Sequence, residues 1–240
     1  MTYFSTGIYT LKQAQRLSGV SAPTIRRWVY GYHRKAQSGN AAENRFIQPL
    51  WKPQIPSKQF EVQVIGFLDL VEIRFVNEFV RHGVPLTVVR NCLARAKKLF
   101  NNDYPFTSGQ FQTDGETIFV EALEETTRDD EGNLIDLKSG QYAFKKIILP
   151  SLFTDFNYKD NVADKWYQNG QKTVVLDPER KYGSPIIDKT GVPTDVLYSS
   201  YRAEGGNEFA IEQTARVYGI ELDLVRDAIN FEKKLDGYMH

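Results

Sequence analysis

The first 58 residues of the chain concentrate positive charge that could bind phosphate. This stretch holds nine Lys and Arg and one acid, Glu43. Arg26 and Arg27 are adjacent, and Lys35 directly follows Arg34. Lys and Arg donate charge-assisted hydrogen bonds to phosphate oxygens, and the scarcity of carboxylates removes a source of repulsion. The pattern predicts a surface that binds a polyanion.

The rest of the chain has the opposite charge. From residue 106 to the C-terminus there are 15 Lys and Arg and 24 Asp and Glu, although the whole chain has a formal net charge of zero. From residue 205 onward, seven acids stand against four basic residues, which gives a net charge of −3. Such a region would repel phosphate, so we expect it to dimerise or to bind another protein.

No other residues form a catalytic or metal-binding pattern. His33, His82 and His240 are far apart in sequence and lack metal-ligand spacing. The single cysteine, Cys92, excludes a disulfide framework and is expected to be a buried small hydrophobe. The acidic run 129–131 precedes Gly132 and is typical of a hairpin turn. We therefore expect no enzymatic activity, no cofactor and no metal.

Two short helices joined by a glycine turn are expected to position the basic residues. Thr10 and Gln13 have the spacing of a capping box at the start of the first helix, which Gly19 ends. Ser21 then caps a second helix that stops at Gly31. This pattern predicts a helix-turn-helix, a unit whose second helix enters the major groove of DNA.

The helix-turn-helix gives two sets of expected DNA contacts. The residues expected near base edges are Ser21, Ala22, Thr24 and Arg26. The residues expected to reach phosphate are Arg27, Tyr30, Tyr32, His33, Arg34 and Lys35. Segments 45–47 and 50–52, which include Lys52, are either strands of a wing beside the groove or parts of a solvated loop. Trp28 is expected in the core.

The remaining elements predict a mainly α fold with a small β part. Helices are expected at 67–81, 86–100, 194–203, 208–218 and 222–234. Short strands are expected at 174–176 and 185–187, and a β-meander at 117–123, 134–137 and 141–144. We expect a DNA-binding domain over 1–100, a β-meander and aromatic linker over 101–170, and a C-terminal three-helix, helix-turn-helix-like domain over 171–240. No apolar run is long enough to span a membrane, so a cytoplasmic protein is expected.

Several motifs resemble those of known families. Residues 8–14, 17–21 and 24–28 resemble the winged helix-turn-helix of MerR-like regulators, and 67–100 resembles the second helix pair of that fold. The C-terminal motifs resemble an antitoxin domain long catalogued as of unknown function; they are 174–178, 183–188, 190–197, 201–205, 217–220, 225–229 and 231–232. Residues 111–119 and 139–144 are similar to its two-domain members.

The resemblance implies a VapB-type antitoxin, the partner of a toxin with a PIN-like ribonuclease fold. It implies neutralisation of that toxin, repression of the operon through operator DNA, and a homodimer formed through the C-terminal domain. Two alternatives stay open. One is a stand-alone MerR-like transcription regulator, in which the aromatic residues of 153–167 line a ligand pocket. The other is a structural adaptor whose helix-turn-helix binds nothing.

Overall fold

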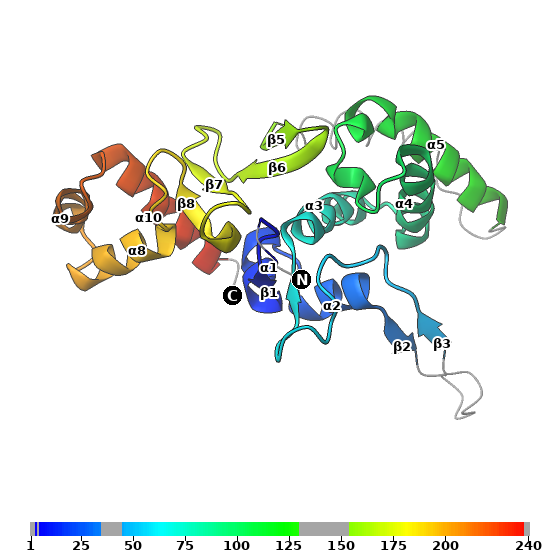
Figure 1. Cartoon of the computed structure of the whole chain (residues 1–240), viewed down its shortest axis with the longest axis horizontal. Coiled ribbons are helices and arrows are strands. Elements are labelled where there is room, and N and C mark those ends of the chain that lie inside the picture. Colours follow the sequence, from blue (N-terminus) through cyan, green and yellow to red (C-terminus); the bar gives the residue numbers. More distant parts are fainter. Residues whose placement is uncertain (1–2, 4, 35–44, 130–153, 238–240) are drawn as a thin grey trace. The chain divides into compact units, whose positions relative to one another are not determined.

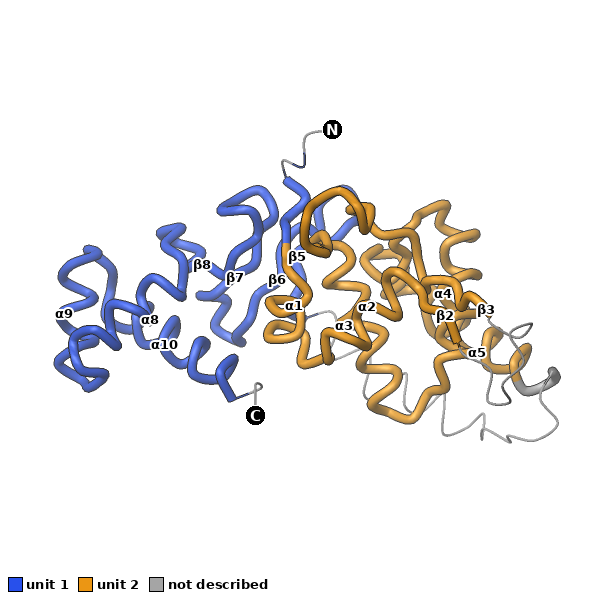
Figure 2. Tube along the Cα trace, turned by 90° about the horizontal axis from the view of Figure 1, so that it is seen from below, with its two compact units in different colours: residues 1–8, 154–240 blue, residues 9–153 orange. Residues whose placement is uncertain are grey.

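The computed structural model describes residues 3, 5–34, 45–129 and 154–237 (Figure 1). The chain divides into two compact units (Figure 2). One unit comprises residues 9–153, which we call the N-terminal unit. The other comprises residues 1–8 together with 154–240, which we call the C-terminal unit.

The N-terminal unit begins with the helix-turn-helix that the sequence predicts. Helix α1 spans Leu11–Ser18 and helix α2 spans Ala22–Tyr30. Thr10 and Gln13 form the expected capping box at the start of α1, and Gly19 ends the helix with a φ of 71°. The buried residues of α2 are Ile25, Trp28 and Val29, as expected from their spacing.

A wing follows the second helix. Strand β2 (Tyr32–Arg34) pairs antiparallel with β3 (Arg45–Ile47), and their register places His33 opposite Phe46. The strand expected at 50–52 is wrong, because this segment turns away from the hairpin: the Leu50 N–H donates to the Trp28 carbonyl oxygen at 2.8 Å. A second small ladder joins β1 (Tyr9–Thr10) to β4 (Val64–Ile65).

Two long helices and a third helix form the rest of the N-terminal unit. Helices α3 (Phe67–Arg81) and α4 (Leu86–Phe100) have the predicted bounds. The short 3₁₀ helix η2 (Pro105–Thr107) leads into α5 (Gln110–Asp129), which packs against α4. Between these helices lies a cluster of buried phenylalanine rings centred on Phe106, whose ring centroid lies 4.6, 5.4 and 5.9 Å from those of Phe111, Phe79 and Phe75.

The β-meander prediction is wrong for residues 117–123, which lie inside α5. The buried side chains Phe111, Ile118, Phe119, Ala122 and Leu123 recur with helical spacing and pack on α4 and η2. Residues 117–123 contain a short apolar run, and in such a run the strand and helix periods are hard to tell apart. The other two expected meander strands, 134–137 and 141–144, lie outside the described residues.

The C-terminal unit contains a four-stranded antiparallel sheet in the order β5-β6-β7-β8. Its strands are β5 (Phe156–Lys159), β6 (Val162–Tyr167), β7 (Val174–Leu176) and β8 (Pro185–Ile187). The last two strands have the predicted bounds. Residue 8 joins this unit, because the Ile8 N–H donates to the Tyr182 carbonyl oxygen at 2.9 Å.

Three helices complete the C-terminal unit. They are α8 (Thr194–Ala203), α9 (Glu208–Tyr218) and α10 (Leu222–Gly237). The first two match their predicted bounds, and the third is longer than expected. Helix α10 packs on α8, on α9 and on strands β7 and β8.

Two further expectations can be compared with the described part of the chain. No helix there is both long enough and apolar enough to cross a membrane. Cys92 is fully buried, as expected, and burial raises the pKa of its thiol well above the ordinary value.

Candidate nucleic-acid interface

Local hydrogen bonds hold the N-terminal end of α2 in place. The Ser21 hydroxyl accepts from the Thr24 N–H at 3.4 Å, and the two hydroxyls lie 2.8 Å apart. The Gln15 side chain of α1 reaches across the turn, where its Oε1 accepts from the Ala22 N–H at 2.9 Å. These contacts fix the first turn of α2 relative to α1, so the residues expected near base edges stand on a rigid element.

Gly31 lets the wing come close to α2. Its φ is 72°, in the left-handed region that glycine adopts without strain. A Cβ added here would lie 2.5 Å from the Ile47 carbonyl oxygen and 2.7 Å from the Phe46 ring. Both the backbone conformation and the available space therefore require glycine at the junction of α2 and β2.

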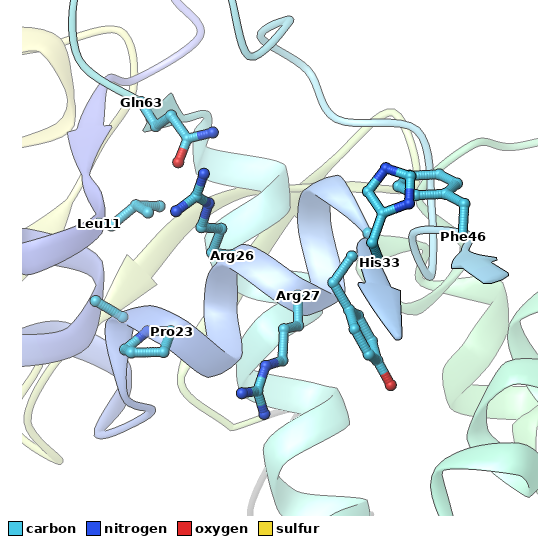
Figure 3. A pocket seen from close by; sticks show the side chains of 10 residues that line it. Leu11, Pro23, Arg26, Arg27, His33, Phe46 and Gln63 are labelled. Atoms are coloured by element: carbon cyan, nitrogen blue, oxygen red, sulfur yellow. The ribbon is translucent and has the colours of Figure 1, made fainter. Parts of the chain in front are cut away.

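The space between α2 and the wing is a hollow of about 700 Å³. Its lining comes from α1, α2, the wing and the segment before β4, and comprises Leu11, Ala22, Pro23, Arg26, Arg27, Gly31, Tyr32, His33, Phe46 and Gln63. Figure 3 shows the Arg26 side chain extending toward Gln63 while Arg27 projects away from it along the other side of α2. The side chains of the adjacent Arg26 and Arg27 thus lie on two different parts of the surface.

Aromatic rings border the hollow on the wing side. The Arg27 guanidinium carbon lies 5.7 Å from the centroid of the Tyr32 ring. The His33 and Phe46 rings lie side by side across the β2–β3 pair, with centroids 5.0 Å apart (Figure 3). A cation held over an aromatic face loses less conformational freedom when it binds an anion, so the Tyr32 ring restricts Arg27 in a way that suits the phosphate contact that the sequence predicts.

The helix-turn-helix and the described part of the wing segment carry charges of one sign. Residues 9–34 and 45–58 contain no Asp or Glu and eight Lys and Arg. All but Arg16 are exposed, namely Lys12, Arg26, Arg27, Arg34, Arg45, Lys52 and Lys58. The register of the wing places Arg45 directly opposite Arg34. Two neighbouring like charges on a strand pair repel each other unless an anion lies between them.

The structure brings together most of the expected contact residues. Ser21, Ala22, Thr24, Arg26 and Arg27 lie on or directly before α2, and Tyr32, His33 and Arg34 form β2. Lys52 is exposed on the segment that leaves the wing. Lys35 lies outside the described residues.

Tyr30 differs from the other expected phosphate contacts. Its hydroxyl donates to the Val64 carbonyl oxygen at 2.6 Å, so its proton is already used within the fold. Burial and the nearby Asp69 raise the pKa of Tyr30 to about 12. A phosphate oxygen accepts hydrogen bonds, and the Tyr30 hydroxyl already donates its one proton to Val64. This hydrogen bond links α2 to β4.

Five residues that line the hollow are absent from the predicted DNA contacts, namely Leu11, Pro23, Gly31, Phe46 and Gln63. The first three belong to the predicted helix-turn-helix, whereas Phe46 and Gln63 lie outside it. The sequence around Phe46 is compatible with a wing strand and with a loop. The strand register of the structure shows that Phe46 lies opposite His33. Gln63 lies far from α2 in sequence and carries no local signal. It joins the hollow because β4 pairs with β1, immediately before α1.

A buried carboxyl group anchors the segment that leaves the wing. Asp69 of α3 accepts from the Trp51 Nε1–H at 2.8 Å and from the Gln54 and Gly66 N–H groups at 3.1 and 2.9 Å. Burial raises the pKa of Asp69 to about 6, although all three of these donors favour the ionised form. Trp51 is therefore a core residue.

The other end of this segment is held from α4. The Arg90 guanidinium donates to the carbonyl oxygens of Pro49 and Gln48 at 2.9 and 3.0 Å. Together, Arg90 and Asp69 fix the base of the wing to the two long helices. The wing and α2 consequently belong to one rigid platform.

Comparison with known proteins places this surface in a recognised class. Residues 7–93 match a family model described as "Putative DNA-binding HTH domain". The matched region contains α1, α2, the wing, α3 and about the first half of α4. The N-terminal unit therefore carries a DNA-binding helix-turn-helix domain of this class.

Similarity to a relative covers nearly the whole chain and defines the family. The chain is 32% identical over 236 residues to "Putative antitoxin VapB45" of Mycobacterium tuberculosis (strain ATCC 25618 / H37Rv), covering 95% of this chain and 94% of the relative. The chain belongs to this family of VapB antitoxins.

Two further proteins are similar to this chain over nearly its whole length. The chain is 22% identical to "Uncharacterized protein Rv2308" of the same strain, over 95% of this chain and 90% of that protein. Its fold matches the X-ray crystal structure of Rv2018 from Mycobacterium tuberculosis with a TM-score of 0.69 and 26% identity, covering 94% of this chain and 99% of the other.

Proposed function

We propose that this protein is the antitoxin of a type II toxin-antitoxin system. It binds operator DNA through α2 and the wing, represses its own operon, and neutralises a toxin with a PIN-like ribonuclease fold. The observation that carries the DNA-binding part is a solvent-facing surface in which residues 9–34 and 45–58 supply seven exposed cations and no carboxylate. Membership of a VapB antitoxin family supports the toxin-binding part.

The proposed docking follows from the hollow between α2 and the wing. The N-terminal turn of α2, with Ser21, Thr24 and Arg26, enters the major groove, while the wing lies over the adjacent backbone. Arg27 and Arg34 then contact phosphates on either side. A homodimer of such units would read two half-sites spaced by whole helical turns, about 10–10.5 bp or a multiple of it.

Toxin binding is assigned to the acidic remainder of the chain. Residues 106–240 carry nine more acids than basic residues, from 24 Asp and Glu and 15 Lys and Arg. A ribonuclease needs positive charge along the path of its RNA, so an acidic partner is electrostatically complementary to it. This division leaves the basic N-terminal surface free for DNA.

A double substitution tests the DNA-binding part. Arg26→Ala combined with Arg27→Ala should abolish binding to the intergenic DNA upstream of the gene, measured by gel shift, while the toxin still co-purifies. The matched control is Lys97→Ala with Lys98→Ala, which removes the same charge from exposed positions at the end of α4. Equal loss in both variants would mean that only net charge matters and would contradict the proposed contacts.

A co-expression experiment tests the toxin-binding part. The chain and the product of the adjacent gene should co-purify, and the chain should restore growth that the neighbour alone arrests. A chain that binds its upstream DNA but no neighbouring product would instead be a stand-alone regulator. A chain that binds neither would contradict both parts of the proposal.

The regulator alternative depends on a pocket in the aromatic segment 153–167. In the described part of that segment, Phe156 and Trp166 are buried, with their rings stacked at a centroid distance of 5.5 Å. These two rings support strands β5 and β6 and pack against each other. This packing gives no support to a ligand pocket in the described part of the segment, so we propose the antitoxin function.

A further inference from the structure

Helix α9 of the C-terminal unit exposes large apolar side chains. Phe209 is 59% exposed and Val217 is 72% exposed, the highest fraction among the exposed large hydrophobic residues. Single exposed apolar side chains are ordinary on protein surfaces. These two lie eight residues apart on one short helix, which places them at the two ends of a single stripe.

The stripe faces away from the body of the unit. The buried residues of α9 are Ala210, Ile211, Thr214 and Ala215, and they define the inner face that packs on α8 and α10. Both views show α9 on the side of α8 and α10 that is remote from the sheet of this unit (Figures 1 and 2). The outward positions are therefore 209, 212, 213, 216 and 217, which we call the α9 stripe.

The polar residues of the α9 stripe carry opposite charges. Glu212 and Arg216 are exposed and lie between the two apolar ends, with the half-buried Gln213 in the middle. Glu208, one turn before Glu212, is not part of the stripe because its carboxylate pairs with Arg226 of α10. The order along the stripe is therefore apolar, acidic, polar, basic, apolar.

The α9 stripe is complementary to a second copy of itself that runs in the opposite direction. In an antiparallel pair of α9 helices related by a two-fold axis between positions 213 and 214, Phe209 of one copy comes near Val217 of the other, and Glu212 comes near Arg216. Each contact then occurs twice, as a two-fold symmetric interface requires. We infer that the α9 stripe is the surface through which two copies of this chain pair.

This inference rests on the proposed function for the expectation of a homodimer, and it adds the contact surface and the direction of pairing. An eleven-residue helix is about 16 Å long. A face of that length is smaller than the standard interface of a stable complex. The stripe alone therefore supports a weak, concentration-dependent dimer, which two adjacent half-sites on DNA strengthen through effective concentration.

Reversing single charges provides the test. Glu212→Arg leaves only positive charges on the stripe and Arg216→Glu leaves only negative ones, so each variant should repel itself. We expect each to raise the dimer dissociation constant at least tenfold in sedimentation velocity. An equimolar mixture of the two should associate again as a heterodimer, because each Arg then faces a Glu of the other copy. Glu179→Arg, an exposed site outside α9, is the matched control and should dimerise like the unaltered chain.

Several outcomes would overturn the inference. The first is a monomeric unaltered chain at 100 µM. The second is a dimer that both single variants retain. The third is a failure of the mixed variants to associate although circular dichroism shows each to be folded. Loss of toxin co-purification with intact dimerisation would reassign the stripe to the toxin. The proposed function is judged separately: a chain that pairs through α9 but binds neither DNA nor toxin would refute that function and leave the pairing standing.

Discussion

The salt dependence of DNA binding is the sharpest test of how the two adjacent arginines divide their work. We propose that five cations neutralise phosphates in each half-site. Arg27, Arg34 and Lys35 are among the predicted phosphate contacts, and the exposed Arg45 and Lys52 are added from the wing and the segment that leaves it. Each phosphate-bound cation contributes about −0.9 to the slope of log K against log salt. The unaltered chain should therefore show a slope of about −4.5 per half-site, or roughly a 500-fold loss of affinity between 50 and 200 mM salt.

Removing two of these cations should flatten the slope by a calculable amount. Arg27→Ala with Arg34→Ala leaves about three phosphate contacts, a slope of about −2.7, and a loss of only about 40-fold over the same salt range. Arg26→Ala is the matched comparison, because Arg26 extends into the hollow toward Gln63 and is assigned to base edges. It should leave the slope within about half a unit and reduce the preference for operator over scrambled duplex.

The assay is fluorescence anisotropy with labelled duplexes, operator and scrambled, over a series of KCl concentrations. The double variant and the Arg26 variant should differ in slope, and only the Arg26 variant should differ in specificity. An unchanged slope in the double variant would show that Arg27 and Arg34 do not contact phosphate. An equal change of slope in both variants would refute the separate roles of the adjacent arginines.

Three further substitutions test the platform that carries the interface. Gly31→Ala should weaken operator binding at least tenfold, because its Cβ would lie 2.5 Å from the Ile47 carbonyl oxygen; Gly83→Ala, with a similar φ but nothing within 4 Å, should bind normally in the same anisotropy assay. Tyr30→Phe should lower the free energy of unfolding by about 1 kcal/mol in urea titrations and leave the salt slope unchanged, since its hydroxyl serves Val64. The pKa of Asp69 is raised from 3.8 to about 6 in the folded state. Between these two pH values the folded state therefore keeps the Asp69 proton, whereas the unfolded state has lost it. Stability should therefore fall by up to about 3 kcal/mol as the pH rises from 4 to 7, and Asp69→Asn should remove that part of the pH dependence; identical pH profiles would contradict it.

The helix-turn-helix could be predicted from sequence because its signals are local. Thr10, Gly19, Ser21 and Gly31 each act within one turn of the residue that they position, as caps or breaks of the two helices. Capping side chains satisfy the free N–H groups at a helix start, and glycine accepts the left-handed conformation at its end. Neither effect depends on distant parts of the chain, so the spacing alone was enough.

Elements whose period is ambiguous in isolation could not be predicted in the same way. Residues 117–123 are a short apolar run in which a strand and a buried helix look alike, and packing of α5 on α4 decides for the helix. Strands β5 and β6 were not assigned at all, although β6 pairs with β7. The sequence of this segment shows no clear strand period. The two strands are stabilised by a contact between them, the stacking of Phe156 on Trp166 across the β5–β6 pair.

The candidate site shows the same division between local and distant causes. Arg26 and Arg27 can be identified because charge is visible in sequence, and the helix itself points neighbouring side chains about 100° apart. The surroundings that each side chain meets depend on where the wing and the segment before β4 lie (Figure 3). The wing in turn takes its place from contacts 15 to 42 residues apart, those of Asp69 with Gln54 and of Arg90 with Gln48. Sequence reasoning therefore identifies the charges that bind a polyanion. The surroundings that those charges meet are decided by buried polar contacts, and a buried carboxyl such as Asp69 looks in sequence like any other acid of a helix.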